Sequence, residues 1–181
     1  MIEIETKIDQ IDPEEIVRLL AKNGAKLVSK KLFRRWIFNL EGKKGEDRFI
    51  RVRTDGDTAT LTYKHRFGDS LANTEEIETV VEDFDATAKI ISAIASEPYY
   101  QESRRTVYSL DNVEVAIDEW PKLPPIVEIE GQSEEDVKKA ISRLGIKGRE
   151  LGNIGWERVY SMYGFNLRDY KILKFEENTK R

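Results

Sequence analysis

Charged and uncharged side chains alternate at the start of the chain, where Glu3, Glu5 and Lys7 are separated by Ile4 and Thr6. A β-strand sends residues i, i+2 and i+4 to one face, so this spacing predicts two carboxylates and an ammonium on the same side of a strand. Carboxylates can hold a hard divalent cation such as Mg²⁺ or Mn²⁺, and an ammonium can bind a phosphate oxygen. The segment therefore raises the question of what a strand face with mixed charge would bind.

The same alternation recurs on several later segments, and on each predicted strand one face is apolar while the other carries charge. The charged positions are Arg51, Arg53, Lys64, Glu76, Glu78, Arg105, Asp118, Glu128 and Glu130. One interpretation is that these faces meet water, as one side of an antiparallel sheet commonly does. The alternative is a closed barrel with a charged interior, where cations would grip a polyanion and carboxylates would hold a bridging metal.

The composition favours one globular domain and limits its chemistry. The 181 residues are 39% hydrophobic, the net charge is -4 and there is no cysteine. This excludes thiolate catalysis and gives no bulk attraction to nucleic acid or to an anionic membrane, and any metal would need oxygen ligands. No apolar run approaches the roughly 20 residues of a membrane span, and no signal peptide follows Met1. We expect a cytoplasmic protein without nucleic-acid or membrane partners.

Helical and strand patterns alternate along the chain. Asp12 and Pro13 open a short helix that ends before Gly24, and helical spacing returns in residues 84–95 and 136–145. The segments between them have period two and are bounded by turn residues. About eight strands with helices between them indicate an antiparallel barrel or a strongly curved sheet. Of these we predict an α+β fold with an eight-stranded antiparallel β-barrel and helices packed outside. Residues 1–181 are expected to form one domain, with a core of about 1–150 and a C-terminal helical extension at 151–181.

In their order, the charged motifs resemble those of the CYTH domain family, also called the triphosphate tunnel metalloenzymes, which includes class IV adenylate cyclases and thiamine triphosphatases. The segment from Glu3 to Lys7 is similar to the ExExK signature of that family. The later motifs of the family follow in the same order. Arg51 and Arg53 correspond to its R-x-R strand, Lys64 to its lysine strand, and Glu76 with Glu78 to its middle E-x-E. Arg105 with Tyr108 corresponds to its R-x-x-Y strand, Asp118 to its acidic residue, and Glu128 with Glu130 to its late E-x-E. The length and the Gly24-Ala25 pair are most similar to the class IV cyclase branch.

The resemblance implies roles for these residues. Metal ligands for Mg²⁺ or Mn²⁺ would be Glu3, Glu5, Asp118, Glu128 and Glu130. Substrate contacts would come from Lys7, Arg35, Arg51, Arg53, Lys64, Glu76, Glu78 and Arg105, and catalysis from Lys7, Arg105 and Asp118. The implied partner is a small molecule with a triphosphate, namely ATP, tripolyphosphate or thiamine triphosphate, and a homodimer is left open. The three tryptophans, Trp36, Trp120 and Trp156, are expected to be packing residues.

Two departures from the family pattern bear on the reaction. Ser103 stands where the family often has a lysine, so that one phosphate contact would be missing or supplied by Arg35 or Arg104, and the second strand lacks the Q-x-D-x-Y pattern of characterised cyclases. The expected function is a class IV-type adenylate cyclase, which converts ATP to cyclic AMP and pyrophosphate. The alternative is an inorganic or thiamine triphosphatase, which hydrolyses the terminal phosphate. A non-catalytic sensor of polyphosphate or nucleotide is a third interpretation, from a different class.

Overall fold

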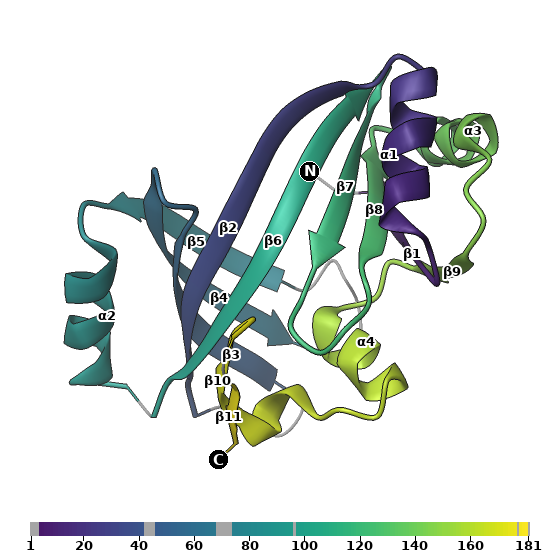
Figure 1. Ribbon diagram of the computed structural model, residues 1–181. Coiled ribbons are helices and arrows are strands. Elements are labelled where there is room, and N and C mark those ends of the chain that lie inside the picture. Colours follow the sequence, from purple (N-terminus) through teal and green to yellow (C-terminus); the bar gives the residue numbers. More distant parts are fainter. Residues whose placement is uncertain (1–3, 42–45, 68–73, 96, 177, 181) are drawn as a thin grey trace. The chain divides into compact units, whose positions relative to one another are not determined.

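The computed structural model describes residues 4–41, 46–67, 74–95, 97–176 and 178–180, in which strands alternate with four α-helices (Figure 1). The chain divides into two units. Unit 1 contains Met1–Lys31 and Ser103–Leu167, and unit 2 contains Leu32–Glu102 and Arg168–Arg181. Two long strands, β2 (Lys26–Asn39) and β6 (Tyr99–Leu110), contribute residues to both units.

Unit 1 is an antiparallel sheet covered on one face by two helices. In order across the sheet, the last part of β6 is followed by β7 (Val113–Glu119), β8 (Ile126–Gly131), β1 (Ile4–Asp9) and β9 (Arg149–Gly152). The helices are α1 (Pro13–Lys22) and α3 (Glu134–Leu144). Asp12 and Ser133 cap these helices by accepting hydrogen bonds from the backbone, and Gly145 ends α3 with a φ of 63°, which favours glycine.

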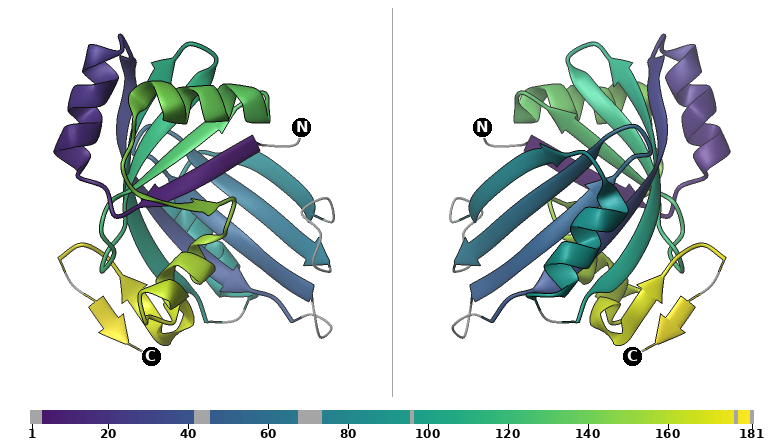
Figure 2. Two further views of the ribbon diagram at one scale, coloured as in Figure 1. Left: turned by 90° about the vertical axis from the view of Figure 1, so that its right-hand side faces the viewer. Right: turned by 90° about the vertical axis from the view of Figure 1, so that its left-hand side faces the viewer.

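The alternation along the strands of unit 1 separates an apolar face from a charged one. Ile8, Val115, Val127 and Ile129 lie in the core with residues of α1 and α3, and α3 lies across the strands (Figure 2, left). Because successive strand residues point to opposite faces, the charged residues between these positions lie on the other face. The helices therefore cover the apolar face, as predicted.

Unit 2 repeats this arrangement with its own core. Its sheet has the order β5 (Thr74–Val81), β4 (Ala59–Phe67), β3 (Glu46–Thr54) and the second half of β2. Helix α2 (Phe84–Ser92) contacts β3 and β4, and its Phe84, Ala88 and Ile91 pack with Phe38 and Val52 of the sheet. The side chains that alternate with this core carry the charges of unit 2.

The closed eight-stranded barrel that we predicted is wrong, although the large antiparallel sheet and the helices are confirmed. The strands form an 11-stranded sheet with the order β5-β4-β3-β2-β6-β7-β8-β1-β9, and β10 and β11 lie off this path. Among the described strands, β5 pairs with β4 alone and β9 with β1 alone, so the sheet is open. The physical reason lies at β1, whose second edge is occupied by β9 at Lys7, Ile8 and Asp9.

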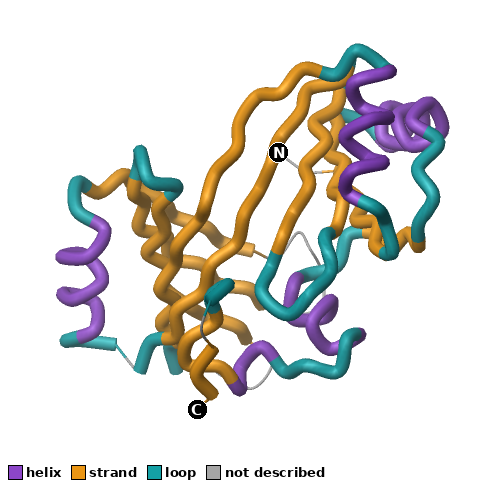
Figure 3. Tube along the Cα trace, in the orientation of Figure 1, coloured by secondary structure: helices purple, strands orange, loops and turns teal. Residues whose placement is uncertain are grey.

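The residues after 151 contain strands as well as the predicted helix (Figure 3). Helix α4 (Trp156–Met162) belongs to unit 1, where the hydroxyl of the buried Tyr160 donates to the carbonyl oxygen of Pro121 at 2.8 Å. A 3-10 helix (Leu167–Asp169) leads to β10 (Tyr170–Leu173) and β11 (Asn178–Lys180), and β10 pairs in parallel with the first residues of β6. In the part of the chain that the structure describes, no helix has the length and apolar character needed to cross a membrane.

Candidate functional site

Lys7 lies at the centre of the charged face of unit 1. Its ammonium Nζ is 2.7 Å from Glu5 Oε1 on the same strand and 2.9 Å from Glu128 Oε2 on β8. The side chain is 4% exposed. Burial disfavours the charged form, but the carboxylates of Glu128 and Glu5 outweigh it and raise the pKa of Lys7 above its ordinary value. Lys7 is therefore a fixed cation.

Arg105 joins two buried carboxylates on the same face. Its Nε donates to Asp118 Oδ1 and its Nη2 to Asp118 Oδ2, both at 2.7 Å, and Nη2 also donates to Glu128 Oε1 at 2.7 Å. Burial raises the pKa of Asp118 although Arg105 opposes this. Burial acts in the same direction on Glu128, but Arg105 and Lys7 outweigh it and lower its pKa. Glu5, Lys7, Glu128, Arg105 and Asp118 thus form one connected set, the charge cluster of unit 1.

A row of three glutamates crosses the same face beside this cluster. Glu130 of β8 lies opposite Glu5 of β1 and opposite Glu114 of β7 in the strand register. Like charges directly opposite each other on neighbouring strands are destabilising, and a divalent cation with oxygen ligands would relieve the repulsion. Glu5 and Glu130 therefore fit the donor chemistry of Mg²⁺ or Mn²⁺. Sequence reasoning missed Glu114, although its spacing from Asp118 places both on one face.

The other predicted metal ligands have different surroundings. Asp118 and Glu128 are engaged by Arg105 and Lys7, because these cations stand on the neighbouring strands. Glu3 lies outside the described residues. Within the described ranges, no three carboxylate or histidine side chains converge closely enough to hold a metal by themselves. The five-ligand metal site stays a prediction, and the facing pair of Glu5 and Glu130 is the part that the geometry supports.

Three cations on the charged face of unit 2 are held by two glutamates of β5. Arg51 Nη2 is 3.6 Å from Glu76 Oε1 and 3.4 Å from Glu78 Oε2. Lys64 Nζ is 2.7 Å from Glu76 Oε2, and Arg53 Nη2 is 3.9 Å from Glu78 Oε2. Arg51, Arg53 and Lys64, the cation row of unit 2, are thus brought together on one face.

Thr62 orders the middle of this face. It is fully buried, and its hydroxyl donates to Glu78 Oε2 at 2.6 Å and accepts from Arg51 Nη2 at 3.3 Å. The Thr62 hydrogen bond is the main cause of the lowered pKa of Glu78. Thr62 was not predicted as a functional residue, because a threonine on a strand carries no signal by itself.

Arg35 extends the cation row across one more strand. It lies directly opposite Arg53 in the pairing of β2 with β3. The guanidinium carbon of Arg53 is 5.5 Å from the centroid of the Phe33 ring, which is a favourable distance for a cation–π contact. The predicted phosphate contacts of unit 2 therefore share one face.

A second network in unit 1 fixes the end of β1. Asp9 is fully buried, Arg149 Nε donates to Asp9 Oδ1 at 3.0 Å, and the Tyr163 hydroxyl donates to Asp9 Oδ2 at 2.9 Å. Burial tends to raise the pKa of Asp9, but the hydrogen bonds from Arg149 and Tyr163 outweigh it and hold the pKa below its ordinary value. Asp9 was not predicted as a functional residue, and its contacts with β9 and with Tyr163, which follows α4, are structural.

We predict that Asp9 contributes to the acid sensitivity of the fold. An acid with a lowered pKa in the folded state adds stability above its unfolded pKa, and the contribution is lost as the pH falls through the folded pKa. Asp9→Asn should therefore lower the free energy of unfolding at pH 7 by about 1.5–3 kcal/mol, as expected for hydrogen bonds to a charged group. Urea unfolding at pH 7 and at pH 3 measures this. A difference between the two proteins that is equally large at pH 3 would contradict the assignment.

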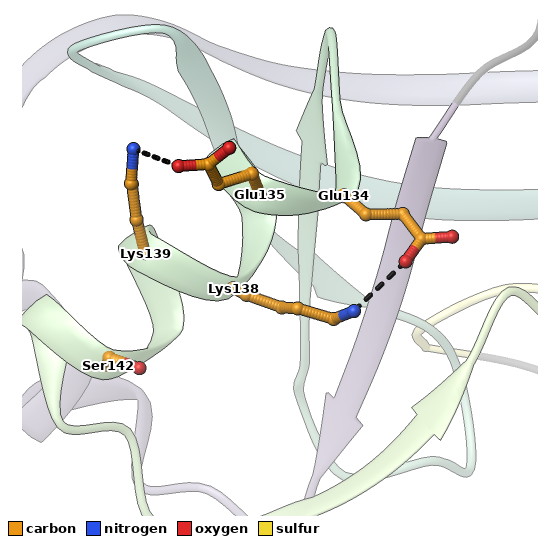
Figure 4. Close-up of a pocket in the computed structure, with 5 residues that line it drawn as sticks. All are labelled: Glu134, Glu135, Lys138, Lys139 and Ser142. Atoms are coloured by element: carbon orange, nitrogen blue, oxygen red, sulfur yellow. Dashed lines mark hydrogen bonds and ion pairs between the residues drawn. The ribbon is translucent and has the colours of Figure 1, made fainter.

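A surface pocket lies on α3, the helix that covers the apolar face of unit 1. It is lined by Glu134, Glu135, Lys138, Lys139 and Ser142, all of α3 (Figure 4). The two lysines pair with the two glutamates one turn earlier, at 2.9 Å and 2.6 Å, and all four side chains are at least 70% exposed. Exposed pairs of this kind are weak and are screened by salt, so we assign no binding role to this pocket.

Comparison with known proteins gives one family match and several similar folds. The model of the CYTH domain matches residues 1–151. No curated protein matches the chain in sequence. The PH1012 protein of Pyrococcus horikoshii OT3 is 23% identical, with a TM-score of 0.63 over 81% of this chain and 92% of its own.

Two further solved structures carry functional names. A "putative adenylate cyclase" from Vibrio parahaemolyticus is 9% identical, with a TM-score of 0.64 over 88% of this chain and 97% of its own. HpAC1 from Hippeastrum, an adenylyl cyclase candidate described as having a dominant triphosphatase activity, is 15% identical, with a TM-score of 0.55 over 90% of this chain and 96% of its own. At these identities the similarity concerns the fold.

Proposed function

Because the chain belongs to the CYTH domain family, we propose that it is a divalent-metal-dependent enzyme that acts on the phosphate chain of a triphosphate. The observation that carries this proposal is the cation row of unit 2. Arg51, Arg53 and Lys64 share one face, and two glutamates of β5 balance their charge. Phosphate oxygens bind such cations through charge-assisted hydrogen bonds, so a triphosphate with several negative charges would compete with the glutamates for them.

The charged face of unit 1, taken by itself, carries a second set of groups with the chemistry that a triphosphate and its metal require. Lys7 and Arg105 are fixed donors for phosphate oxygens, and they would offset charge that develops during phosphoryl transfer. Glu5 and Glu130 would hold Mg²⁺ or Mn²⁺. Such a cation, when bound, neutralises charge on the phosphate chain and on the leaving group. The carboxylate of Asp118 keeps Arg105 in place and is not required to leave that contact.

Cyclisation of ATP is the first candidate reaction. The ribose 3′-hydroxyl would attack the α-phosphorus and lose its proton, and pyrophosphate would leave. The length of the chain and the Gly24-Ala25 pair support this choice through their resemblance to the class IV cyclase branch.

Hydrolysis to orthophosphate and a diphosphate is the second candidate. The cations of the described ion pairs would bind phosphate oxygens in both reactions, so they do not favour one reaction over the other. Ser103 is buried on β6, two residues before Arg105, and it leaves that position without a cation. HpAC1, which is similar in fold, is described as having a dominant triphosphatase activity.

One experiment separates these reactions. We expect purified protein with Mg²⁺ or Mn²⁺ to convert ATP to cyclic AMP and pyrophosphate, and we expect excess EDTA to abolish the turnover. ATP, tripolyphosphate and thiamine triphosphate should be offered in parallel, with products separated by chromatography. Orthophosphate and a diphosphate, without cyclic AMP, would assign a triphosphatase. Binding without any product would favour a sensor, and full activity in EDTA would contradict the metal dependence.

A matched pair of variants links the activity to the cation row. Lys64→Ala removes a cation that is held against Glu76 and should raise the KM for the triphosphate. Lys138→Ala removes an exposed cation on α3 that is paired with Glu134 and should leave the KM unchanged. Equal effects of the two substitutions would indicate nonspecific attraction.

A further inference from the structure

An aromatic ring from outside the family region lies against the central cation of unit 1. Trp156 is the first residue of α4, and the CYTH domain match ends at residue 151. The Lys7 ammonium lies 5.9 Å from the centroid of the Trp156 ring. A ring face within about 6 Å of an ammonium attracts it, and the attraction is stronger where water is excluded.

We propose that Trp156 is a positioning residue for Lys7, which it holds in the orientation that meets the phosphate chain of the substrate. This inference rests on the function proposed above. It assigns to the C-terminal extension a part in the site, whereas the sequence predicted a packing role for all three tryptophans.

The Trp156 ring is itself held in place. Its centroid lies 4.7 Å from that of Trp120, and the ring of Tyr160 meets Trp120 edge-on at 6.2 Å. Trp120 is 5% exposed and Tyr160 is fully buried. Tyr160 also donates to the carbonyl oxygen of Pro121, so the aromatic stack is tied to the loop between β7 and β8. A ring supported in this way restricts where the end of the Lys7 side chain can move.

The Trp156 ring differs from the other neighbours of Lys7 because it does not need to accept a hydrogen bond from the ammonium. An ammonium has three N–H donors, and the contacts with Glu5 and Glu128 account for two of them. A third carboxylate would consume the last donor, whereas an aromatic face stabilises the charge without requiring a conventional hydrogen bond. The third N–H is thereby kept for an oxygen of the substrate.

Two substitutions in the full chain separate the two roles. Trp156→Phe keeps an aromatic face, and Trp156→Leu keeps an apolar side chain without one. We expect Trp156→Leu to raise the Kd for tripolyphosphate and the KM for the triphosphate that is turned over by about 5- to 20-fold, and Trp156→Phe to change both by less than about 3-fold. The larger effect lies in the range for partly to fully desolvated cation–π contacts. Unfolding by urea shows whether the two variants have lost similar stability.

A double-mutant cycle with Lys7→Met tests whether Trp156 acts through Lys7. In the Lys7→Met background, Trp156→Leu should cause no further loss of affinity. An undiminished loss in that background would overturn the proposal, and so would equal affinities for the Leu and Phe variants.

A spectroscopic measurement tests the contact without activity. The ring should shift the NMR signals of the Lys7 ε-methylene protons to high field, and the shift should be lost in Trp156→Leu and retained in Trp156→Phe. Its absence in the wild type would overturn the contact. If the wild type binds tripolyphosphate but turns over none of ATP, tripolyphosphate and thiamine triphosphate, the proposed enzyme function fails while the ratios of Kd still decide the role of Trp156. If it binds no triphosphate, both proposals fail.

Discussion

Replacing Arg105 with alanine should lower the free energy of unfolding by about 3–5 kcal/mol, because removal of one partner leaves buried charges uncompensated. Asp118 would lose two hydrogen bonds of 2.7 Å and Glu128 would lose one. The Asp118 side chain is 3% exposed, so its carboxylate is poorly hydrated and depends on the guanidinium for its hydrogen bonds. Urea unfolding at pH 8 measures the loss.

The free energy of unfolding that Arg105→Ala loses should be smaller at pH 5 than at pH 8. Burial already raises the pKa of Asp118 in the intact protein, and without Arg105 the main opposing interaction disappears. The folded variant would then take up a proton that its unfolded chain does not hold. A carboxyl group whose folded pKa lies above its unfolded pKa loses its favourable contribution as the pH rises through the folded pKa. Stability should therefore decrease from pH 5 to pH 8.

The double variant Arg105→Ala/Asp118→Asn is the control for this mechanism. The amide has nearly the shape of the carboxylate but no charge, so it should recover a large part of the lost stability and remove the pH dependence. A loss below about 1 kcal/mol in Arg105→Ala, which is the range of exposed pairs, would show that the pair is not buried in solution.

Replacing Glu130 with alanine should reduce turnover by about 100-fold or more while the free energy of unfolding changes by less than about 1 kcal/mol. The activity falls because half of the facing pair of carboxylates is lost. Stability is preserved because Glu130 lies between Glu5 and Glu114, and the substitution relieves repulsion between like charges. Turnover of ATP measured over a range of Mg²⁺ concentrations gives the maximal rate and the Mg²⁺ concentration for half-maximal turnover. This concentration should rise in the variant.

Glu114→Ala is the matched control, since it also removes a carboxylate that faces Glu130 but comes from β7, where the side chain is exposed. We expect it to keep most of the turnover. If it were as damaging as Glu130→Ala, the total charge of the row rather than the pair of Glu5 and Glu130 would determine activity. Full turnover in Glu130→Ala would contradict the metal assignment.

Alternation along the chain predicted the faces of the sheet but not its edges. Ile8, Val115 and Ile129 are buried as their period required, because the burial of one face dictates the pattern. The predicted barrel did not include β9, β10 and β11. These strands have four, four and three residues. Segments this short cannot show a period, and their pairing depends on neighbours that are remote in the sequence.

The site shows the same division between face and register. Spacing predicted that Lys7 and Glu128 would stand on charged faces, yet it could not predict that they are directly opposite each other. Register depends on turn geometry and on the packing of the other face. The hydrogen bonds of Thr62 and the contact of Trp156 with Lys7 depend on three-dimensional neighbours, so the composition of their own segments carried no signal for them.

The division of unit 1 into two segments has a consequence for synthesis on the ribosome. Strand β1 leaves the ribosome before its partners β8 and β9, which follow only after all of residues 32–102. All strands of unit 2 except β10 and β11 are therefore synthesised before unit 1 can form its sheet. Pairing between such distant segments folds slowly and leaves early strands exposed to misassembly. A chain interrupted at residue 102 would carry β1 and α1 with no sheet to join, so its first strand would depend on chaperones or be degraded.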